Sequence, residues 1–206
     1  MSEFKKVDVR NIVRNSYGKI ARGNAKEDGC CGGSSINLKN SSIEISRKIG
    51  YSDEDISTTP EGANMGLGCG NPQLIANIKE GETAIDLGSG GGFDCFLASK
   101  KVGLKGYIIG IDMTPEMVNK SRVMSKKNRY RNVDFRLGEI ENLPVADNTA
   151  DVIISNCVIN LSPNKQRVYN EACRVLKKGG RIAISDIVLI RELTEEMKQD
   201  EKLYCG

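Results

Sequence analysis

The chain has no histidine among its 206 residues. Histidine is the commonest general base near neutral pH and the commonest partner of cysteine in zinc sites. Its absence excludes an imidazole general base and a mixed Cys–His zinc site together. Any catalysis by this chain must therefore work without imidazole.

Long apolar runs and a strong charge of one sign are absent as well. No stretch approaches the length of a membrane-spanning helix, and residues 1–10 lack the apolar segment of a secretory signal. Thirty basic and 27 acidic side chains give a net charge of +3, too close to neutral to indicate nucleic-acid binding. The basic stretch at residues 120–131 is interpreted as the solvated face of a helix. We expect a cytoplasmic protein with neither a membrane nor a nucleic-acid partner.

Strand and helix signals alternate along the chain from residue 80 onward. Apolar runs predict strands at residues 83–88, 106–112, 133–138, 150–156 and 181–189. Helices are predicted between them, at residues 93–102, from Thr114–Pro115 to about residue 128, and from Ser162–Pro163 to a stop at residues 177–180. This alternation predicts an α/β fold with a doubly wound, mostly parallel sheet.

The first 72 residues show a different pattern, which predicts a helical cap rather than a second core. One helical face is formed by Val9, Ile12, Val13, Tyr17 and Ile20. Ser41 and Glu44 have capping-box spacing before a second helix that ends at Gly50. Two glycine-rich loops carry cysteines, residues 28–35 and 62–72. We therefore divide the chain into a cap, residues 1–72, and a sheet domain, residues 73–206.

A glycine-rich loop, AIDLGSGGGFD at residues 84–94, follows the first predicted strand. Gly88, Gly90 and Gly92 have the spacing G-x-G-x-G, whereas the dinucleotide pattern would need glycine at Phe93. Asp112 ends the second strand, where a carboxylate can accept both hydroxyls of a ribose. Loop, acid and element order together indicate a nucleoside cofactor; the alternative is a tight turn in a nucleotide-free α/β fold.

This loop, with GEIENLPV (138–145) and LKKGGRIAISD (176–186), resembles the class I S-adenosylmethionine-dependent methyltransferases. The resemblance implies that the methionine end of the cofactor lies at Asp86 and the glycine loop, the ribose at Asp112, and the adenine at Met113, with Glu139 and Ile140 at its edge. We add Asn156, at the end of the fourth strand. The predicted cofactor-binding residues are Asp86, Gly88, Ser89, Gly90, Gly92, Asp112, Met113, Glu139, Ile140 and Asn156.

Seven cysteines narrow the chemistry further. In a cytoplasmic protein they are expected to be reduced thiols, acting as ligands or nucleophiles rather than forming disulfides. Cys95 and Cys173 lie in predicted helices beside apolar neighbours and are predicted core residues. Cys157 is either a small core residue or a soft ligand, and its place at the ligand-binding edge, with Cys69 in a glycine-rich loop, favours the ligand. Several thiols without histidine suit a thiophilic ion rather than zinc.

Four segments resemble the arsenite methyltransferases: GLGCGNP (66–72), DLGSGGGFDC (86–95), GIDMTPEMV (110–118) and SNCVINLSPNKQRV (155–168). The resemblance implies that cysteine thiolates hold trivalent arsenic, whose lone pair attacks the sulfonium methyl group without a general base. Cys69 and Cys157 match the arsenic-ligand positions and are the predicted catalytic residues. Cys31, or its neighbour Cys30, matches an N-terminal redox cysteine, and Cys31 is a further candidate arsenic ligand. Arsenite or its thiol conjugates would be the substrate, and glutathione or a thioredoxin-like protein the reductant.

The resemblance continues past Gly206 into a substrate-binding region, with the third thiol falling just after that residue. We therefore expect the chain to bind S-adenosylmethionine but to bind arsenite weakly and turn over slowly or not at all; the alternative is that Cys205 serves as the third ligand. Two other functions stay open. One is a small-molecule C- or O-methyltransferase, such as a quinone methyltransferase, and the other is a thiol-based metalloid-binding protein without turnover.

Overall fold

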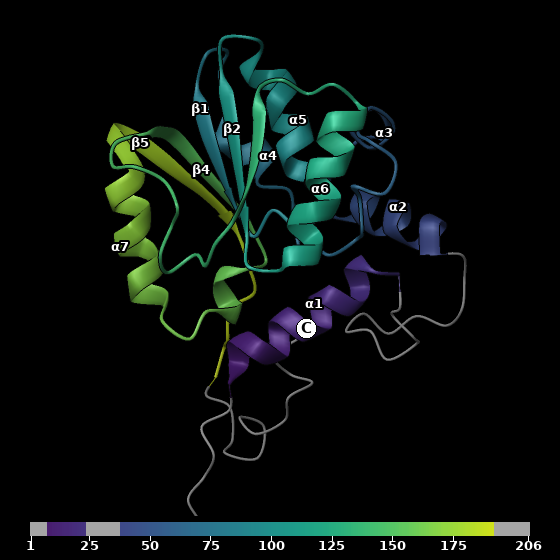
Figure 1. The fold of residues 1–206 in the computed structure, drawn as a ribbon, viewed down its shortest axis with the longest axis horizontal. Coiled ribbons are helices and arrows are strands. Elements are labelled where there is room, and N and C mark those ends of the chain that lie inside the picture. The colour runs from purple at the N-terminus through teal and green to yellow at the C-terminus, as the bar shows by residue number, and fades with distance from the viewer. Residues whose placement is uncertain (1–7, 24–37, 192–206) are drawn as a thin grey trace, which may run out of the picture.

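The structure, a computed structural model, describes residues 8–23 and 38–191, so Cys30, Cys31 and Cys205 lie outside the described residues. Within these ranges, five strands form one sheet in the order β3-β2-β1-β4-β5, and each neighbouring pair is parallel (Figure 1). The strands are β1 (Thr83–Leu87), β2 (Tyr107–Asp112), β3 (Val133–Leu137), β4 (Ala150–Asn156) and β5 (Leu176–Ser185). The helices are α1 (Val9–Ala21), α2 (Leu38–Lys48), α3 (Asp53–Ser57), α4 (Gln73–Ala76), α5 (Phe93–Val102), α6 (Pro115–Lys127), the 3-10 turn η1 (Ile159–Leu161) and α7 (Lys165–Val175). The predicted doubly wound α/β fold is confirmed.

Aliphatic side chains bury both faces of the sheet. Ile85 of β1 is in register with Ile109 of β2 and Ile153 of β4, and all three pack on the face covered by α7. The alternate residues of the same strands pack on the opposite face, against Phe96 of α5 and Val118 of α6. A sheet covered on both faces needs nearly continuous apolar strands. This requirement explains why the strands could be recognised as short apolar runs.

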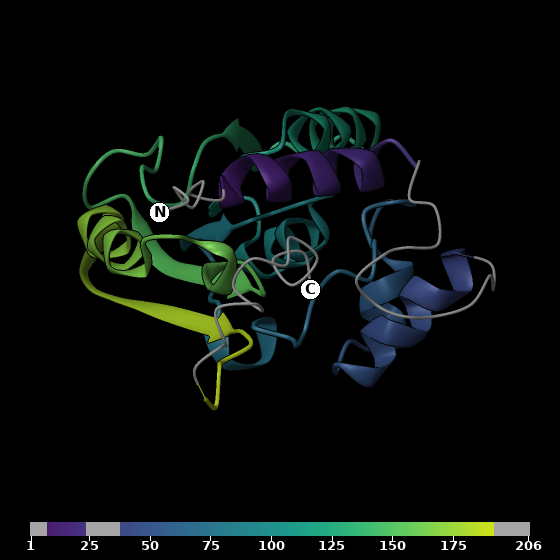
Figure 2. The same cartoon turned by 90° about the horizontal axis from the view of Figure 1, so that it is seen from below.

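The strand order places β1 at the centre of the sheet, between β2 and β4. The loops that follow β1 and β4 therefore leave the carboxyl edge in different directions. In open α/β sheets, ligands bind in the crevice at this switch point. Helix α1 lies across the same edge, below the strands in Figure 1 and running over them in the view from below in Figure 2.

Several element boundaries differ from the prediction. Helix α2 begins at Leu38 rather than after Ser41. Helix α7 begins at Lys165, because the side chain of Asn164, not Ser162, accepts the N–H of Arg167. Residues 177–180 belong to β5 rather than to a loop, since Leu176 already pairs with Ala150 and an irregularity in the register follows. The short elements α3, α4 and η1 were not predicted; they have five, four and three residues.

The two helical cysteines have different environments. Cys95 of α5 is fully buried, as predicted. Cys173 of α7 is exposed, so the prediction of a core residue is wrong there. Val168, Ala172 and Val175 form the buried face of α7, and the helical repeat turns Cys173 away from it.

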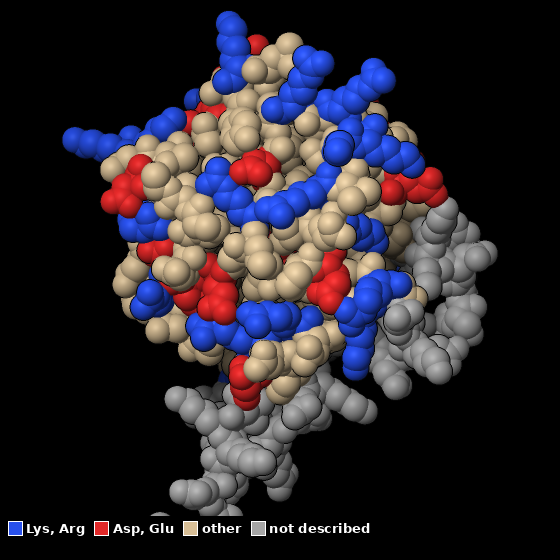
Figure 3. All heavy atoms as spheres, in the orientation of Figure 1, with Lys and Arg blue, Asp and Glu red and all other residues tan. Residues whose placement is uncertain are grey.

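The basic stretch at residues 120–131 lies on α6 and the turn after it. Met117 and Met124 of this helix are buried, whereas Arg122, Lys126 and Lys127 are exposed. Basic and acidic side chains are interspersed over this face of the molecule (Figure 3). This burial pattern agrees with the predicted solvated helix face. Within residues 8–23 and 38–191, no helix combines the length and apolar character needed to cross a membrane.

Candidate functional site

The loop after β1 turns through three glycines. Gly88, Gly90 and Gly92 have φ angles of 70°, 50° and 86°, in the left-handed region that residues with a Cβ rarely adopt. At Gly88, a Cβ would also lie 2.5 Å from Cγ2 of Val158, in the loop that follows β4. The missing side chain at Gly88 therefore lets the loops after β1 and β4 approach each other closely.

Three carboxyl groups surround this loop: buried Asp86 in β1, buried Asp94 in the first turn of α5 and half-buried Asp112 at the end of β2. Burial raises the pKa of Asp86 well above its ordinary value, and the nearby charge of Asp94 raises it further. Burial also raises the pKa of Asp94 and the pKa of Asp112, although both carboxyl groups accept hydrogen bonds. Such a wall favours a ligand that brings positive charge.

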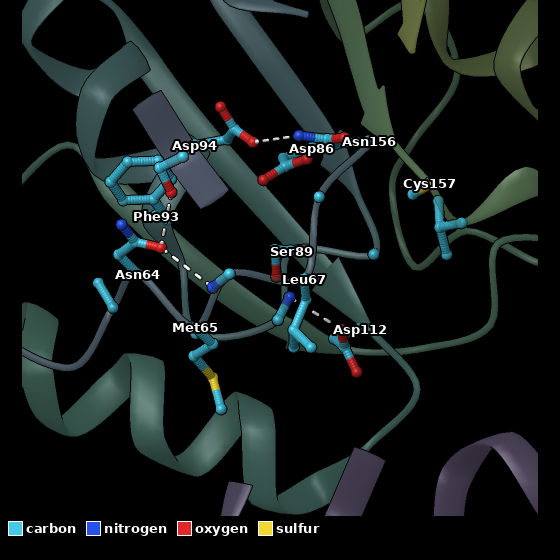
Figure 4. Close-up of a pocket in the computed structure, with 18 of the residues that line it drawn as sticks. Asn64, Met65, Leu67, Asp86, Ser89, Phe93, Asp94, Asp112, Asn156 and Cys157 are labelled. Atoms are coloured by element: carbon cyan, nitrogen blue, oxygen red, sulfur yellow. Dashed lines mark hydrogen bonds between the residues drawn. The ribbon is translucent and has the colours of Figure 1, made fainter. Parts of the chain in front are cut away.

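Two adjoining cavities lie along the carboxyl edge of the sheet. The first, of about 110 Å³, is enclosed by the glycine loop, residues 63–68 of the cap and the end of β4 (Figure 4). The second, of about 70 Å³, lies between the end of β2, residues 138–141 and α1. Both cavities are lined by Tyr17, Gly88, Asp112, Val158 and Leu161. Together they form one elongated site with an acidic end and a more apolar end.

Most of the predicted cofactor residues line these cavities. The first is lined by Asp86, Gly88, Ser89, Gly90, Asp112 and Asn156, and the second by Gly88, Asp112, Met113 and Ile140. Gly92 and Glu139 line neither. A Cβ at Gly92 would lie 2.7 Å from Cζ of Phe135, so this glycine serves the packing of the loop on β3. Glu139 instead forms ion pairs with Arg10 and Arg14 of α1, at 3.5 and 3.3 Å. The binding roles of the lining residues stay predictions.

Residues that no motif singled out also line the site. Val13 and Tyr17 belong to the apolar face of α1, whose spacing predicted only a buried helix. Asn64 comes from the loop before Cys69, where the glycine-rich sequence gave no signal for a ligand. Nδ2 of Asn64 and Oγ of Ser89 are buried without a hydrogen-bond partner among the described residues. Because buried polar atoms are nearly always paired, these two atoms suit a polar ligand.

Cys157 lines the first cavity, and Cys69 lies beside it. Their Cα atoms are 5.7 Å apart, and the structure joins the two sulfurs as a disulfide. The prediction of separate reduced thiols is wrong for this pair in the structure, because the two loops bring the Cα atoms to the separation that a disulfide requires. The φ angle of Cys157 is 58°, an uncommon value for a residue with a Cβ. Its N–H donates to the carbonyl of Ser185 in β5, at 2.8 Å, which holds this conformation.

Asn156 stands between this cysteine pair and the acidic wall (Figure 4). Its Oδ1 accepts the backbone N–H of Cys69 at 3.1 Å, and its Nδ2 donates to the carbonyl of Gly70 at 2.8 Å. Nδ2 also lies 3.2 Å from the hydroxyl of Tyr51 and 3.4 Å from Oδ2 of Asp94. The amide therefore connects the end of β4 to the loop that carries Cys69.

The remaining predicted thiols do not join this pair in the described part of the chain. Cys31, the predicted redox residue, lies outside the described residues, as do Cys30 and Cys205. In residues 8–23 and 38–191, no three His, Cys, Asp or Glu side chains gather closely enough to hold a metal ion. The described site therefore offers two sulfurs, and a third arsenic ligand stays a prediction.

Comparisons with known proteins agree with this geometry. A family profile described as a methyltransferase domain matches residues 78–206. An arsenite methyltransferase from Halobacterium salinarum is 45% identical over 97% of this chain and 52% of the relative. An arsenite methyltransferase from Aquipseudomonas alcaligenes is 38% identical over 95% of this chain and 56% of the relative. The chain thus spans about half the length of these curated relatives.

A solved structure shows the same likeness. The crystal structure of an arsenic(III) S-adenosylmethionine methyltransferase from Chlamydomonas reinhardtii matches with a TM-score of 0.60 and 35% identity. The match covers 79% of this chain and 56% of that chain. The similarity therefore includes the cap as well as the sheet.

Proposed function

The chain belongs to the family of proteins with a methyltransferase domain, and we propose on this premise that it is the S-adenosylmethionine-binding part of an arsenite methyltransferase, an enzyme that methylates trivalent arsenic. One observation carries the proposal. Cys157 lines the cavity that is bounded by the glycine loop and three acids, and its sulfur meets that of Cys69. A methyl donor in this cavity and arsenic on these sulfurs would be neighbours.

The cavities fit S-adenosylmethionine in the character of their two ends. The buried polar atoms of Ser89 and Asn64 and the acids beside them would hold the charged methionine end. Asp112 lines both cavities and would hold the ribose, while Met113 and Ile140 would contact the adenine. When bound, S-adenosylmethionine supplies a methyl group activated by a sulfonium.

The protein's own task at the thiol pair is to hold the substrate. Trivalent arsenic bound to thiolates keeps a lone pair and carries no proton that must be removed. This chemistry accounts for a site without histidine, because no general base is required. Holding the reacting groups together can itself lower the free-energy barrier by on the order of 7–11 kcal/mol.

The disulfide has to open before arsenic can bind. Two thiols of a reductant such as glutathione would supply two electrons and two protons, giving the thiols of Cys69 and Cys157 and one disulfide of the reductant. Thiolates then become available as pH approaches the ordinary cysteine pKa of about 8.5. A thiol reductant is therefore part of the proposed reaction.

Methyl transfer with labelled S-adenosylmethionine, arsenite and glutathione tests the proposal. Two proteins are compared: this chain, and a chimera that continues after Gly206 with the C-terminal half of the Halobacterium salinarum relative. We expect labelled methylarsenicals from the chimera and loss of the product in its Cys157→Ser variant. The exposed Cys173→Ser variant is the matched control and should keep full activity.

A quinone precursor, offered as a second substrate, distinguishes an arsenite methyltransferase from the alternative, a small-molecule C- or O-methyltransferase. If the chimera transfers label to a quinone precursor and none to arsenite, the proposed substrate is wrong. If calorimetry finds no S-adenosylmethionine binding by this chain, the assignment of the cavities is wrong.

A further inference from the structure

The side-chain amide of Asn156 binds the backbone on both sides of Cys69. Oδ1 accepts the N–H of Cys69 at 3.1 Å, and Nδ2 donates to the carbonyl of Gly70 at 2.8 Å. Cys69 and Gly70 lie in a bend and not in a strand, so the side chain of Asn156, rather than strand pairing, holds this backbone.

A buried group fixes which way the amide points. Nδ2 also faces the hydroxyl of Tyr51 and Oδ2 of Asp94, at 3.2 and 3.4 Å. Tyr51 is 4% exposed, and its hydroxyl donates to Oδ1 of Asp94 at 2.8 Å. Burial, and then the charge of Asp94, raise the pKa of Tyr51, so the hydroxyl stays a donor. A flipped amide would set its oxygen against the carbonyl of Gly70 and the carboxylate of Asp94, both of which are acceptors. The observed orientation is therefore the favoured one.

The backbone beside Cys69 approaches this amide closely. A Cβ at Gly68 would lie 2.6 Å from Nδ2 of Asn156, closer than real Cβ contacts come. Glycine at position 68 is thus required by the approach of the loop to Asn156. The Gly-Cys-Gly sequence and Asn156 therefore act as one structural unit.

The hydrogen bonds of Asn156 to the Cys69 loop matter most when the disulfide is reduced. The covalent link between the two loops is then gone, and Cys69 is held against β4 by the amide bonds. Apart from its contact with Asn156, the sulfur of Cys69 has one described polar contact with another segment. This contact is long, at 3.6 Å to the carbonyl of Ser185. Both amide hydrogens and the amide oxygen already have partners within the protein. The amide can therefore donate to a cofactor only by giving up one of its bonds within the protein.

We propose that Asn156 is a positioning residue, which keeps the thiol of Cys69 beside that of Cys157, and is not a hydrogen-bonding ligand of S-adenosylmethionine. The inference rests on the proposed function only for the role of the two thiols. Their proximity is a property of the protein and can be measured without arsenic or cofactor.

The effective concentration of the two thiols is obtained by equilibrating the chain with mixtures of reduced and oxidised glutathione. Asn156→Ala is expected to lower this effective concentration by roughly tenfold or more, because two hydrogen bonds to the loop are lost. Ser155→Ala is the matched control. Ser155 is its buried neighbour on β4, and its Oγ has no hydrogen-bond partner in the described part of the chain. In Ser155→Ala, the effective concentration of the two thiols should stay within about twofold of the value in the unchanged chain.

Calorimetry with S-adenosylmethionine provides the second readout. If Asn156 acts only on the thiols, the affinity of Asn156→Ala for S-adenosylmethionine should stay within about threefold of that of the unchanged chain. Loss of affinity with an unchanged thiol pair would overturn the inference and make Asn156 a cofactor ligand. An equal decrease in Ser155→Ala would overturn it too, since packing alone would then explain the effect.

Tyr51→Phe decides the matter if Asn156→Ala does not fold. It removes only the hydroxyl that fixes the amide, and it should lower the effective concentration by about threefold. No change there would contradict the inference. Failure of the proposed function looks different, because the unchanged chain would then bind no S-adenosylmethionine while the effect on the thiol pair persisted.

Discussion

The carboxylate of Asp112 accepts the backbone N–H of Gly90 at 2.9 Å, which ties the end of β2 to the glycine loop after β1. Its second oxygen accepts the N–H of Thr114 at 2.8 Å, at the start of α6. One side chain thus orders the loop and lines both cavities. The residue predicted to bind ribose is also the residue that shapes the place where ribose would lie.

Asp112→Ala should weaken S-adenosylmethionine binding by roughly tenfold or more, because charge-assisted hydrogen bonds to the ribose and the order of the loop are lost together. Asp134→Ala is the matched control, since this acid of β3 lines neither cavity and pairs with Arg136. Calorimetry on both variants provides the measurement. Unchanged affinity in Asp112→Ala would mean that the ribose is held elsewhere.

Removing either sulfur of the pair should weaken the arsenite binding of the reduced chain. Two thiolates held together bind one ion far more tightly than either does alone, so Cys69→Ser and Cys157→Ser should each weaken binding by roughly a hundredfold. Protein-bound arsenic after gel filtration measures the effect, and Cys173→Ser is the control. Near-normal binding in Cys157→Ser would remove this residue from the site.

Asp86→Asn is expected to raise the free energy of unfolding, and more so at higher pH. Burial, and then the charge of Asp94, raise the pKa of Asp86 in the folded chain. The stability that its proton contributes is present below the unfolded pKa of about 3.9 and is lost as pH rises through the folded pKa. Urea unfolding at about pH 5 and about pH 8 should therefore show the larger gain at the higher pH.

The same carboxyl should make cofactor affinity depend on pH. As pH falls through the raised pKa of Asp86, the group gains a proton and loses the negative charge that attracts a sulfonium. Affinity should fall with pH in the unchanged chain, and less steeply in Asp86→Asn. Equal slopes in the two proteins would show that Asp86 does not carry the effect.

Helix α1 should slow the release of the cofactor. Arg10 forms ion pairs with Glu139 and Glu141 at 3.5 and 3.3 Å, and Arg14 pairs with Glu139, so the helix is fastened over the second cavity. The two pairs with Glu139 are partly exposed and contribute little, whereas the carboxylate of Glu141 is buried. The double variant Arg10→Ala/Arg14→Ala should therefore speed dissociation by about threefold to tenfold. Stopped-flow displacement measures the rate.

Arg47→Ala is the control for this experiment, because Arg47 pairs with Asp53 and lines neither cavity. High salt should reduce the difference between the unchanged chain and the double variant. An equal rate in both at low salt would contradict a fastening role for α1.

The sheet and the glycine loop could be predicted because each depends on local sequence. Strand β1 is a short apolar run followed by glycines, and β4 ends where predicted, at Asn156. Strand β5 was harder, because its first residues include a Gly-Gly pair that is typical of a helix stop. Only pairing with β4 brings that segment into the sheet.

The parts of the site that depend on distant contacts were predicted less well. Asn156 lines the first cavity, but the sequence did not predict that its amide binds a loop more than eighty residues away. The sequence also did not predict that the arginines of α1 pair with the carboxylate of Glu139, whose role at the adenine stays a prediction. No local pattern encodes such partners. The boundary at residue 72 and the third arsenic ligand stay predictions.

An arsenic anomalous map of the reduced chain, crystallised with S-adenosylhomocysteine and arsenite, tests the central claim most directly. We predict one arsenic peak bonded to the sulfurs of both Cys69 and Cys157, with the cofactor in the two adjoining cavities and its ribose at Asp112. An arsenic peak away from this pair, or a cofactor bound outside the cavities, would contradict the proposed site.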